Sequence, residues 1–298
     1  MLISVILPAA GSGRRFRGEG RDATASASKI EYLLEGKPVF LHAVDALRGL
    51  PEVFEVLMAV HPQRLGEFEM RWGAALSDRG VRLVAGGLAE RWETVKLALD
   101  RVDPRASHVA VHDAARPIVP QAVLERLVRA GRRWPAVVPV LPISSTVKRV
   151  GPLPPEWSGD RQGMGDAEAG QDAADRILSA IGPDEGDGSS NDERRLVIET
   201  VPRANLVAVQ TPQLFEVSLL RRAYAEALDD PRGMAGITDD ASLVERLREA
   251  VVTVQGHGSN LKITRPEDAE LLAGLLKQRT ESAARKRAVA ELFGDDED

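Results

Sequence analysis

The sequence predicts an α/β fold, a mostly parallel twisted sheet with helices on both faces. Short, apolar, β-branched runs alternate with segments of helical spacing about every 25–30 residues, the pattern of βαβ units. A loop containing glycines follows the first apolar run directly, where a strand would pass into a helix. The chain of 298 residues is 43% apolar, which is sufficient to bury a core.

The elements follow from local periodicity. Residues 2–8 (LISVILP) and 53–60 (VFEVLMAV) are apolar runs rich in β-branched residues, and each predicts a buried strand. Between them, residues 37–49 carry apolar side chains at roughly helical spacing. The same reasoning, continued to residue 140, predicts strands at 82–85, 107–111 and 136–140 and helices at 91–102 and 120–132.

Residues 151–195 interrupt this alternation. They contain eight glycines, eleven Asp or Glu and four Arg, so the segment carries 4 − 11 = −7 charges. Such a composition cannot bury enough apolar surface to offset the entropy of ordering, and it predicts a mobile surface insertion with one helical turn at 174–181. A second polar insertion, 17–28, would be either a lid or a disordered loop, and its position beside the glycine loop favours a lid. Beyond residue 195 the sequence predicts strands at 196–200, 206–210 and 250–254 and helices at 216–228, 238–247 and 266–277, the last continuing toward 293.

Composition excludes several functional classes. The net charge of −6 opposes binding to nucleic acid through bulk charge, and aromatic residues make up only 4% of the chain. The absence of cysteine excludes disulfides, thiolate nucleophiles and cysteine-based metal sites. No apolar run approaches the ~20 residues that cross a bilayer, and the N-terminus lacks the features of a signal peptide. We therefore expect a cytoplasmic protein without a membrane partner.

The first candidate motif is the loop that runs from Pro8 to Arg15 (PAAGSGRR). Glycines after a buried strand let backbone N–H groups approach an anion closely, because no Cβ intervenes. The dinucleotide-binding fingerprint requires a third glycine, and Phe16 stands at that position here. The two arginines directly after the glycines favour a phosphate chain that carries more charge than the bridge of a dinucleotide. The alternative is an ordinary tight turn with solvated arginines.

The second motif, His112-Asp113-Ala114-Ala115-Arg116-Pro117, follows a predicted strand. A carboxylate at the C-terminal end of a parallel strand lies where open α/β sheets bind ligands. Asp113 would hold a ribose hydroxyl or help to position Mg²⁺, and Arg116 would contact a phosphate. The alternative is that Asp113 caps the next turn and pairs with Arg116. His112 is expected to be a packed or hydrogen-bonding residue rather than a base.

Two further segments have both a ligand-binding and a structural interpretation. Lys262 lies just before a helix that begins near Pro266, where it would reach a second anion or remain a solvated lysine. Thr238-Asp239-Asp240 is typical of a helix N-cap followed by an acidic first turn. The sharper interpretation of this segment is a paired-carboxylate metal site.

Taken in order, the motifs resemble the 2-C-methyl-D-erythritol 4-phosphate cytidylyltransferases of the non-mevalonate isoprenoid pathway. The resemblance covers nearly the whole chain apart from the two insertions and the acidic tail. It rests on PAAGSGRRF (8–16), SKIEYLLEGKPVFLHAV (28–44), GGLAERWETV (86–95), VHDAARPIV (111–119), STVKR (145–149), VPRANLVAVQTPQLF (201–215), ITDDAS (237–242) and GSNLKITRPEDAELL (258–272).

The resemblance implies a Rossmann-like nucleotidyltransferase fold with a protruding dimerisation arm. One domain would span residues 1–280, with the arm at about 143–205 and a charged tail at 281–298. It implies a homodimer, because an arginine of the arm would reach the partner's site.

The resemblance also assigns roles to residues, first on the CTP side. The glycine loop would hold the CTP phosphates and base, and two cations would neutralise charge on the α-phosphate and the departing pyrophosphate. The assigned residues are Ala9, Ala10, Gly11 and Gly13 for the loop, Arg15 and Lys29 for the cations, and Gly87 and Thr94 for cytosine.

On the acceptor side, the resemblance places Arg203 and Lys262 as the pair that grips the methylerythritol phosphate and aims it. Asp113 and Arg116 match substrate-side contacts, and Thr146, Thr211 and Thr238 match the lining of the sugar-phosphate pocket.

The implied reaction joins CTP to a polyol phosphate. Because the attacking phosphate is already anionic, positioning and cationic stabilisation suffice, with Mg²⁺ bridging the triphosphate. Two departures from the usual family pattern stand out: Ser28-Lys29-Ile30-Glu31-Tyr32 replaces Pro-Lys-Gln-Tyr-Leu, and Ser145 stands where Asp is common. The alternatives are a transferase acting on ribitol 5-phosphate or a related polyol phosphate, and a non-catalytic sugar-nucleotide-binding protein. A nicotinamide-dependent dehydrogenase is the weakest alternative.

Overall fold

The computed structural model describes residues 1–11, 28–153 and 195–293. The chain divides into two compact units, one formed by Met1–Leu141 with Ala208–Asp298 and the other by Pro142–Val207. The expected arm, about 143–205, falls within the second unit. The expected boundary between domain and tail at residue 280 falls inside helix α9 (Pro266–Phe293), which continues through it.

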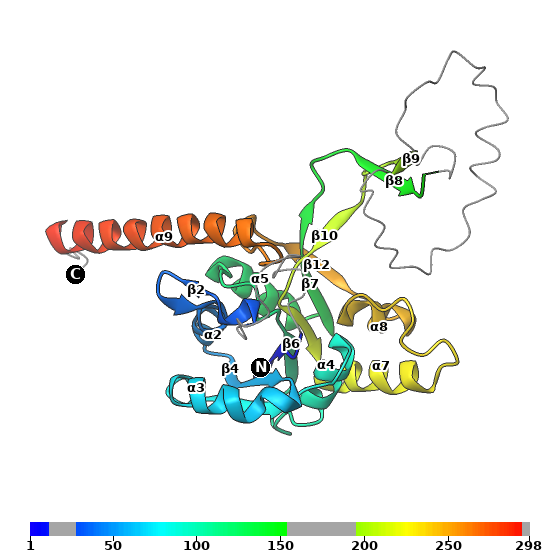
Figure 1. Cartoon of the computed structure of the whole chain (residues 1–298), viewed down its shortest axis with the longest axis horizontal. Coiled ribbons are helices and arrows are strands. Elements are labelled where there is room, and N and C mark those ends of the chain that lie inside the picture. The colour runs from blue at the N-terminus through cyan, green and yellow to red at the C-terminus, as the bar shows by residue number, and fades with distance from the viewer. Residues whose placement is uncertain (12–27, 154–194, 294–298) are drawn as a thin grey trace, which may run out of the picture. The chain divides into compact units, whose positions relative to one another are not determined.

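The first unit is built on a mostly parallel sheet, as the sequence predicts (Figure 1). Strands β1, β4, β5 and β6 are parallel to one another, and β12 is parallel to β7. Strand β11 is antiparallel to both β6 and β7. The strand order is β10-β7-β11-β6-β1-β4-β5, with β12 beside β7, and the bounds are β1 (Ile3–Ala9), β4 (Val53–Val60), β5 (Val81–Ala85), β6 (His108–Val111), β7 (Ala136–Pro142), β10 (Val207–Val209), β11 (Gln213–Glu216) and β12 (Val252–Gln255).

Alternation along the central strands divides the core into two layers. In β1, Val5 and Leu7 pack on one face of the sheet, and Ile6 packs on the other. Successive side chains of a strand point to opposite faces, so a strand that is apolar throughout must be covered on both. One face is covered by α2 (Val39–Arg48), α3 (Leu65–Ser77) and α5 (Gln121–Gly131), and the other by α4 (Arg91–Leu99), α7 (Val217–Asp229) and α8 (Asp240–Arg246).

A smaller apolar cluster joins α9 to the hairpin of β2 (Leu33–Leu34) and β3 (Lys37–Pro38). Ala269 and Leu272 of α9 pack there against Leu34, Val39 and Ile263. Among the helices of the described residues, none combines the length and the apolar character needed to cross a membrane.

Three of the longer elements differ from the sequence-based expectation. Helix α3 was not predicted because it buries only Phe68 and Leu76, so its apolar periodicity is faint. Strand β11 was not predicted because its four residues directly precede α7, and only pairing with β6 and β7 makes them a strand. Strand β8 (Val147–Gly151) was not predicted either, since most of its side chains are solvent-exposed.

The second unit contains an antiparallel pair of strands. Strand β8 pairs with β9 (Leu196–Val201), with Val147 opposite Val201 and Gly151 opposite Leu196. The predicted strand at 196–200 is thereby confirmed. The predicted helical turn at 174–181 lies outside the described residues.

The order of the strands fixes where a ligand would bind. After β1 the chain runs to β4 and β5 on one side and then returns to β6 on the other side of β1. Open α/β sheets bind ligands at the carboxyl ends of the strands where the strand order reverses in this way. The loops that follow β1 and β6 are therefore the expected walls of a site.

We predict that Leu57→Ala, at the fully buried centre of β4, lowers the free energy of unfolding by about 2–5 kcal/mol. The physical reason is lost apolar burial together with a cavity between the sheet and its helices. Urea denaturation measures the change. Leu97→Ala on α4, where the side chain is 45% exposed, serves as the control and should change stability by less than about 0.5 kcal/mol.

Candidate active site

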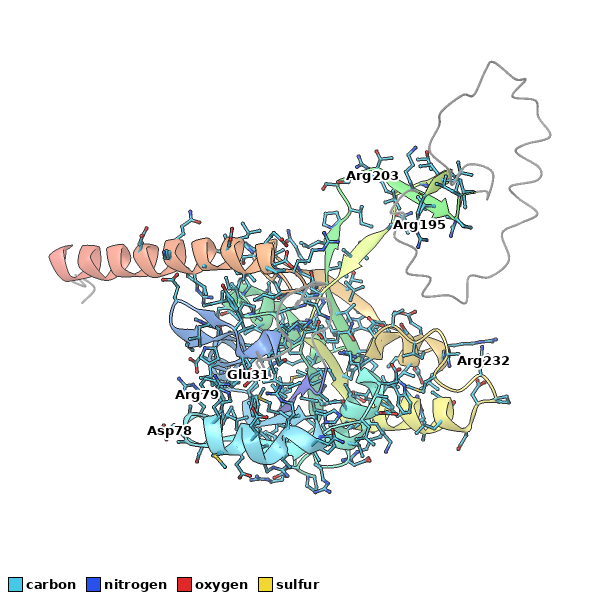
Figure 2. All side chains as sticks on the ribbon, in the orientation of Figure 1. Glu31, Asp78, Arg79, Arg195, Arg203 and Arg232 are labelled. Carbon is cyan, nitrogen blue, oxygen red and sulfur yellow. The ribbon has the colours of Figure 1, made fainter. Side chains whose placement is uncertain are left out.

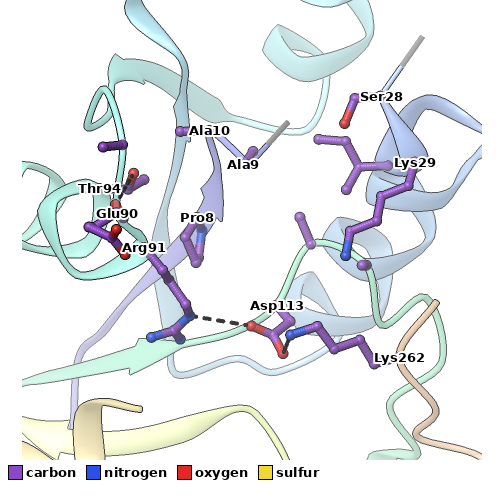
Figure 3. Close-up of a pocket in the computed structure, with 15 residues that line it drawn as sticks. Pro8, Ala9, Ala10, Ser28, Lys29, Glu90, Arg91, Thr94, Asp113 and Lys262 are labelled. Atoms are coloured by element: carbon purple, nitrogen blue, oxygen red, sulfur yellow. Dashed lines mark hydrogen bonds and ion pairs between the residues drawn. The ribbon is translucent and has the colours of Figure 1, made fainter. Parts of the chain in front are cut away.

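A cavity opens where the loops after β1 and β6 meet (Figure 3). Its wall contains backbone from the glycine loop and three cationic side chains, Lys29, Arg91 and Lys262, against two carboxylates, Glu90 and Asp113. The lining residues that the structure describes therefore carry an excess of one positive charge, which favours an anionic ligand. Among the described residues, those that line the cavity are 8–11, 28–30, 89–91, 94, 113–115 and 262.

Asp113 lies at the centre of the charged groups. Its Oδ2 is 3.0 Å from the Lys262 Nζ and 3.4 Å from the Arg116 Nε, and its Oδ1 is 3.6 Å from the Arg91 Nε. Figure 3 shows the first and third of these pairs, with the amino group of Lys29 directed toward the same space. The residue is only 9% exposed, so the three cations replace water as partners of its carboxylate.

Burial alone would raise the pKa of Asp113, but the charges of Lys262, Arg91 and Arg116 outweigh burial and hold this pKa well below its usual range. The carboxylate is therefore ionised at neutral pH. It holds Arg116 of its own loop together with Arg91 and Lys262 from distant parts of the chain.

Arg91 and Asp240 form part of this network, and the sequence predicted neither Arg91 as a site residue nor its contact with Asp240. The Arg91 Nη1 lies 2.8 Å from the Oδ2 of Asp240, whose Oδ1 accepts a hydrogen bond of 2.7 Å from the Tyr224 hydroxyl. Burial opposes the charge of Arg91, yet the neighbouring Asp240 and Asp113 raise its pKa above the usual value. Arg91 is the first residue of α4 and its partner lies 149 residues away, so no local pattern could indicate the contact.

Behind the cavity wall, His112 and Thr211 form a directed chain of hydrogen bonds. The His112 Nε2 lies 3.1 Å from the Arg116 carbonyl, which only accepts, so this nitrogen carries the proton. The Nδ1 then accepts from the Thr211 hydroxyl at 2.9 Å, and the same hydroxyl accepts the Asp113 N–H at 3.1 Å. His112 is fully buried, in agreement with its predicted hydrogen-bonding role.

The segment that carries Lys262 is tied to the loop that carries Asp113. The Arg116 Nη1 donates to the Asn260 carbonyl at 2.7 Å, and the Asn260 side chain donates to the Thr211 carbonyl at 2.8 Å. The Ile263 N–H donates to the Ala115 carbonyl at 2.9 Å. These bonds fix the backbone on both sides of Lys262, and the ion pair with Asp113 restrains its amino group.

Gly86 and Gly87 allow α4 to approach the ends of β1 and β4. A Cβ on Gly86 would lie 2.8 Å from the Thr94 Cγ2 and 3.2 Å from the Val60 carbonyl oxygen, and a Cβ on Gly87 would lie 2.5 Å from the Glu93 Cβ. The Gly87 N–H donates to the Thr94 hydroxyl at 3.0 Å. Close packing here requires glycine, and it places Thr94 in the cavity wall.

The described residues bring together most of the site predicted from the sequence. Gly87, Arg116 and Thr211 support the cavity wall through the contacts above, and the side chain of Arg116 is paired with Asp113, as its structural interpretation predicted. The predicted residues that line the cavity are Ala9, Ala10, Gly11, Lys29, Thr94, Asp113 and Lys262.

Other predicted residues lie elsewhere. Thr238 is exposed and lines a neighbouring hollow beside Arg91 and Asp240. Thr146 and Arg203 are exposed residues of the second unit, where Arg203 contacts the Ser144 carbonyl (Figure 2). The assignments of Thr146 and Arg203 to the site remain predictions. Gly13 and Arg15 lie outside the described residues.

Asp239 and Asp240 have different partners and do not form a carboxylate pair. The Asp239 Oδ1 accepts the Ser242 N–H at 3.0 Å, so the predicted N-cap of this helix is confirmed. Asp240 instead faces Arg91 and Tyr224. The sharper metal-site interpretation of this segment is therefore wrong, because each carboxylate is already engaged with a separate group.

The chain matches the family model of 2-C-methyl-D-erythritol 4-phosphate cytidylyltransferase over residues 3–182 and 187–278. Proteins of that name from Acidobacterium capsulatum and Streptomyces coelicolor are each 36% identical to it, covering 94% and 93% of this chain and 99% and 85% of their own. The crystal structure of the protein of that name from Thermus thermophilus is similar with a TM-score of 0.61 and 26% identity, covering 93% of this chain and 100% of its own.

We predict that His112 makes stability depend on pH. Burial lowers the pKa of His112 to about 4, below the value of about 6.5 in an unfolded chain. The unfolded state therefore binds more protons between these values, so the contribution of neutral His112 is complete above pH 6.5 and is lost as the pH falls toward 4. Wild-type stability should fall by about 2 kcal/mol more than that of His112→Gln between pH 7.5 and 5.0, measured by urea denaturation. Equal losses in both proteins would contradict the assignment.

Proposed function

This chain belongs to the 2-C-methyl-D-erythritol 4-phosphate cytidylyltransferase family, and we propose that its cavity is where CTP and 2-C-methyl-D-erythritol 4-phosphate are joined. The products are 4-diphosphocytidyl-2-C-methyl-D-erythritol and pyrophosphate. One observation carries the proposal: Lys29, Arg91 and Lys262 converge on a single cavity around Asp113, at the carboxyl ends of β1 and β6.

The reaction requires two anions to meet. A phosphate oxygen of the acceptor attacks the α-phosphorus of CTP, and the bond from that phosphorus to the bridging oxygen of the β-phosphate breaks. The leaving pyrophosphate takes the electron pair, and no proton need be removed from the attacking oxygen. Cations that line the cavity would lower the repulsion between the ligands and stabilise the charge that develops on the leaving group.

In the proposed reaction, the two lysines of the cavity lie on the sides of different substrates. Lys29 lies beside the glycine loop, on the side assigned to the triphosphate, and Lys262 lies across Asp113, on the side assigned to the acceptor phosphate. Asp113 neutralises part of the cationic charge while no ligand is bound, and it keeps Lys262 and Arg91 extended into the cavity. Aligning the reactants in this manner provides much of the rate of such transfers.

We assign Mg²⁺ to the triphosphate of CTP, with which it would enter the site. The fit of Asp113 as a ligand is limited by its surroundings, because both of its oxygens face cationic groups. Among the residues that the structure describes, no group of three or more His, Asp or Glu side chains could hold a metal ion. The ion would supply further neutralisation of the phosphate oxygens.

The proposal includes a cytoplasmic homodimer that binds neither nucleic acid nor membrane. Strands β8 and β9 of the second unit expose Val150 and Val197, which are 44% and 54% accessible, and burying them against a second copy would be favourable. Arg203 of the same unit is exposed and would act in the partner's site.

We predict that Lys262→Ala lowers turnover by about 10²–10³, because one cation that stabilises the transferred and attacking groups is lost. Pyrophosphate release with CTP, Mg²⁺ and 2-C-methyl-D-erythritol 4-phosphate measures the effect. Lys96→Ala, which removes an ion pair with Asp100 on the surface of α4, is the matched control and should retain wild-type turnover. Turnover on ribitol 5-phosphate equal to or above that on the methylerythritol substrate would overturn the proposed acceptor.

We predict that mixtures of Arg203→Ala and Lys262→Ala subunits recover activity that neither variant has alone. If Arg203 acts in the partner's site, a mixed dimer contains one intact site and one doubly defective site. Random exchange makes about half of the dimers mixed, so about a quarter of wild-type activity should return after subunit exchange. No recovery, with exchange verified by mass, would place Arg203 in its own subunit's site or outside any site.

A further inference from the structure

The short turn that carries Lys29 contains a buried carboxylate with an unusual number of donors. Glu31 ends the 3₁₀ turn η1 (Lys29–Glu31), and its side chain is only 1% exposed, inside the first unit (Figure 2). Its Oε2 lies 2.7 Å from the Arg64 Nη2 and accepts the Ser28 N–H at 3.0 Å. Its Oε1 accepts the Trp72 Nε1–H at 3.2 Å and lies 3.5 Å from the Arg71 Nη1.

Three of the four donors, all except the Ser28 N–H, come from outside the turn. Trp72 and Arg71 belong to α3, and Arg64 ends η2 (Pro62–Arg64), which leads into it. The Trp72 ring packs edge-on against the Phe40 ring of α2, with 5.6 Å between the ring centroids. The Cζ of Arg71 lies over the Trp72 ring, 5.0 Å from its centroid. The partners of Glu31 are therefore held by the core that covers the sheet.

The same carboxylate reaches both ends of the turn. Glu31 is the last residue of the turn. Its side chain also accepts a hydrogen bond from the N–H of Ser28, the residue just before the turn. Lys29 thus lies between two residues that one buried group fastens to α3. Ser28, Lys29 and Ile30 all line the cavity, whereas Glu31 is not among the lining residues and its side chain is buried.

We infer that Glu31 is a positioning residue that sets the place of Lys29 in the cavity by fastening its turn to Arg64 and Trp72. This inference rests on the proposed function, since it assumes that Lys29 takes part in the transfer. The charge strengthens the attachment, because a carboxylate accepts from two arginines and two N–H groups at once, whereas the amide of a glutamine has a single acceptor oxygen. Burial would raise the pKa of Glu31, but its bonds to Arg64, Trp72 and Ser28 lower it, so the carboxylate is ionised at neutral pH.

A double-mutant cycle between Glu31→Gln and Lys29→Ala tests the inference. Glu31→Gln keeps the shape of the side chain and removes its charge. We expect kcat for pyrophosphate release to fall by about tenfold to a hundredfold while the KM for CTP changes by less than about threefold, because a displaced Lys29 acts mainly on the transferring group. In the Lys29→Ala background the same substitution should lower kcat by less than about twofold, since the group that it positions is gone.

Asp45→Asn is the matched control. Asp45 is a carboxylate of α2 that pairs with Lys37 and Arg79, but it is surface-exposed and has no bond to η1. Its substitution should leave kcat unchanged in both backgrounds. If Glu31→Gln fails to fold, judged by circular dichroism, Trp72→Phe replaces it in the cycle. This variant removes one donor, keeps an aromatic ring against Phe40, and should lower kcat about two- to fivefold, again only when Lys29 is present.

Two results would overturn the inference alone. One is a kcat in Glu31→Gln equal to that of wild type while Lys29→Ala is impaired. The other is an equal loss from Glu31→Gln in both backgrounds, which would show that Glu31 affects general stability. Full activity of Lys29→Ala would instead overturn the role of Lys29 in the proposed function, so the two failures are distinguishable.

Discussion

The ionised Asp113, surrounded by Lys262, Arg91 and Arg116, is the interaction on which the rest of the site depends. Cations gathered in one cavity repel one another, and without a central anion they would turn outward into solvent. A buried carboxylate without cations would be equally unfavourable. The carboxylate and the cations therefore stabilise one another inside the cavity. The positive groups are already assembled before a phosphate binds.

Holding these charged side chains in one place costs conformational entropy, so the groups that position Asp113 and Arg91 must also be fixed. The neutral His112 orders the Thr211 hydroxyl, and that hydroxyl holds the backbone of Asp113. Asp240 holds the far side of Arg91, and Tyr224 in turn holds Asp240. Linked hydrogen bonds and ion pairs of this kind make the site rigid, and rigidity is what electrostatic stabilisation of a reacting phosphate requires.

Sequence reasoning predicts what is local and misses what depends on distant contacts. The parallel sheet follows from apolar runs such as 53–60, and the motif around Asp113 indicates a ligand site because it ends a strand. The contact between Arg91 and Asp240 spans 149 residues, so nothing in either segment alone indicates it. Glu31 was noticed only as a departure from the family pattern, because its partners Arg64 and Trp72 belong to η2 and α3, which the sequence did not predict.

The positions of Lys29 and Lys262 illustrate one solution to a common difficulty. A lysine side chain has several rotatable bonds, so its ammonium group is poorly defined unless something restrains it. For Lys262 the restraint is direct, since its Nζ lies 3.0 Å from the Asp113 carboxylate. For Lys29 the Glu31 carboxylate acts through the backbone by fixing the turn. A direct ion pair must weaken when substrate phosphates compete for the ammonium, whereas restraint through the backbone persists while the ammonium binds a ligand. The position that Glu31 gives to the backbone of Lys29 is therefore kept when a triphosphate binds there.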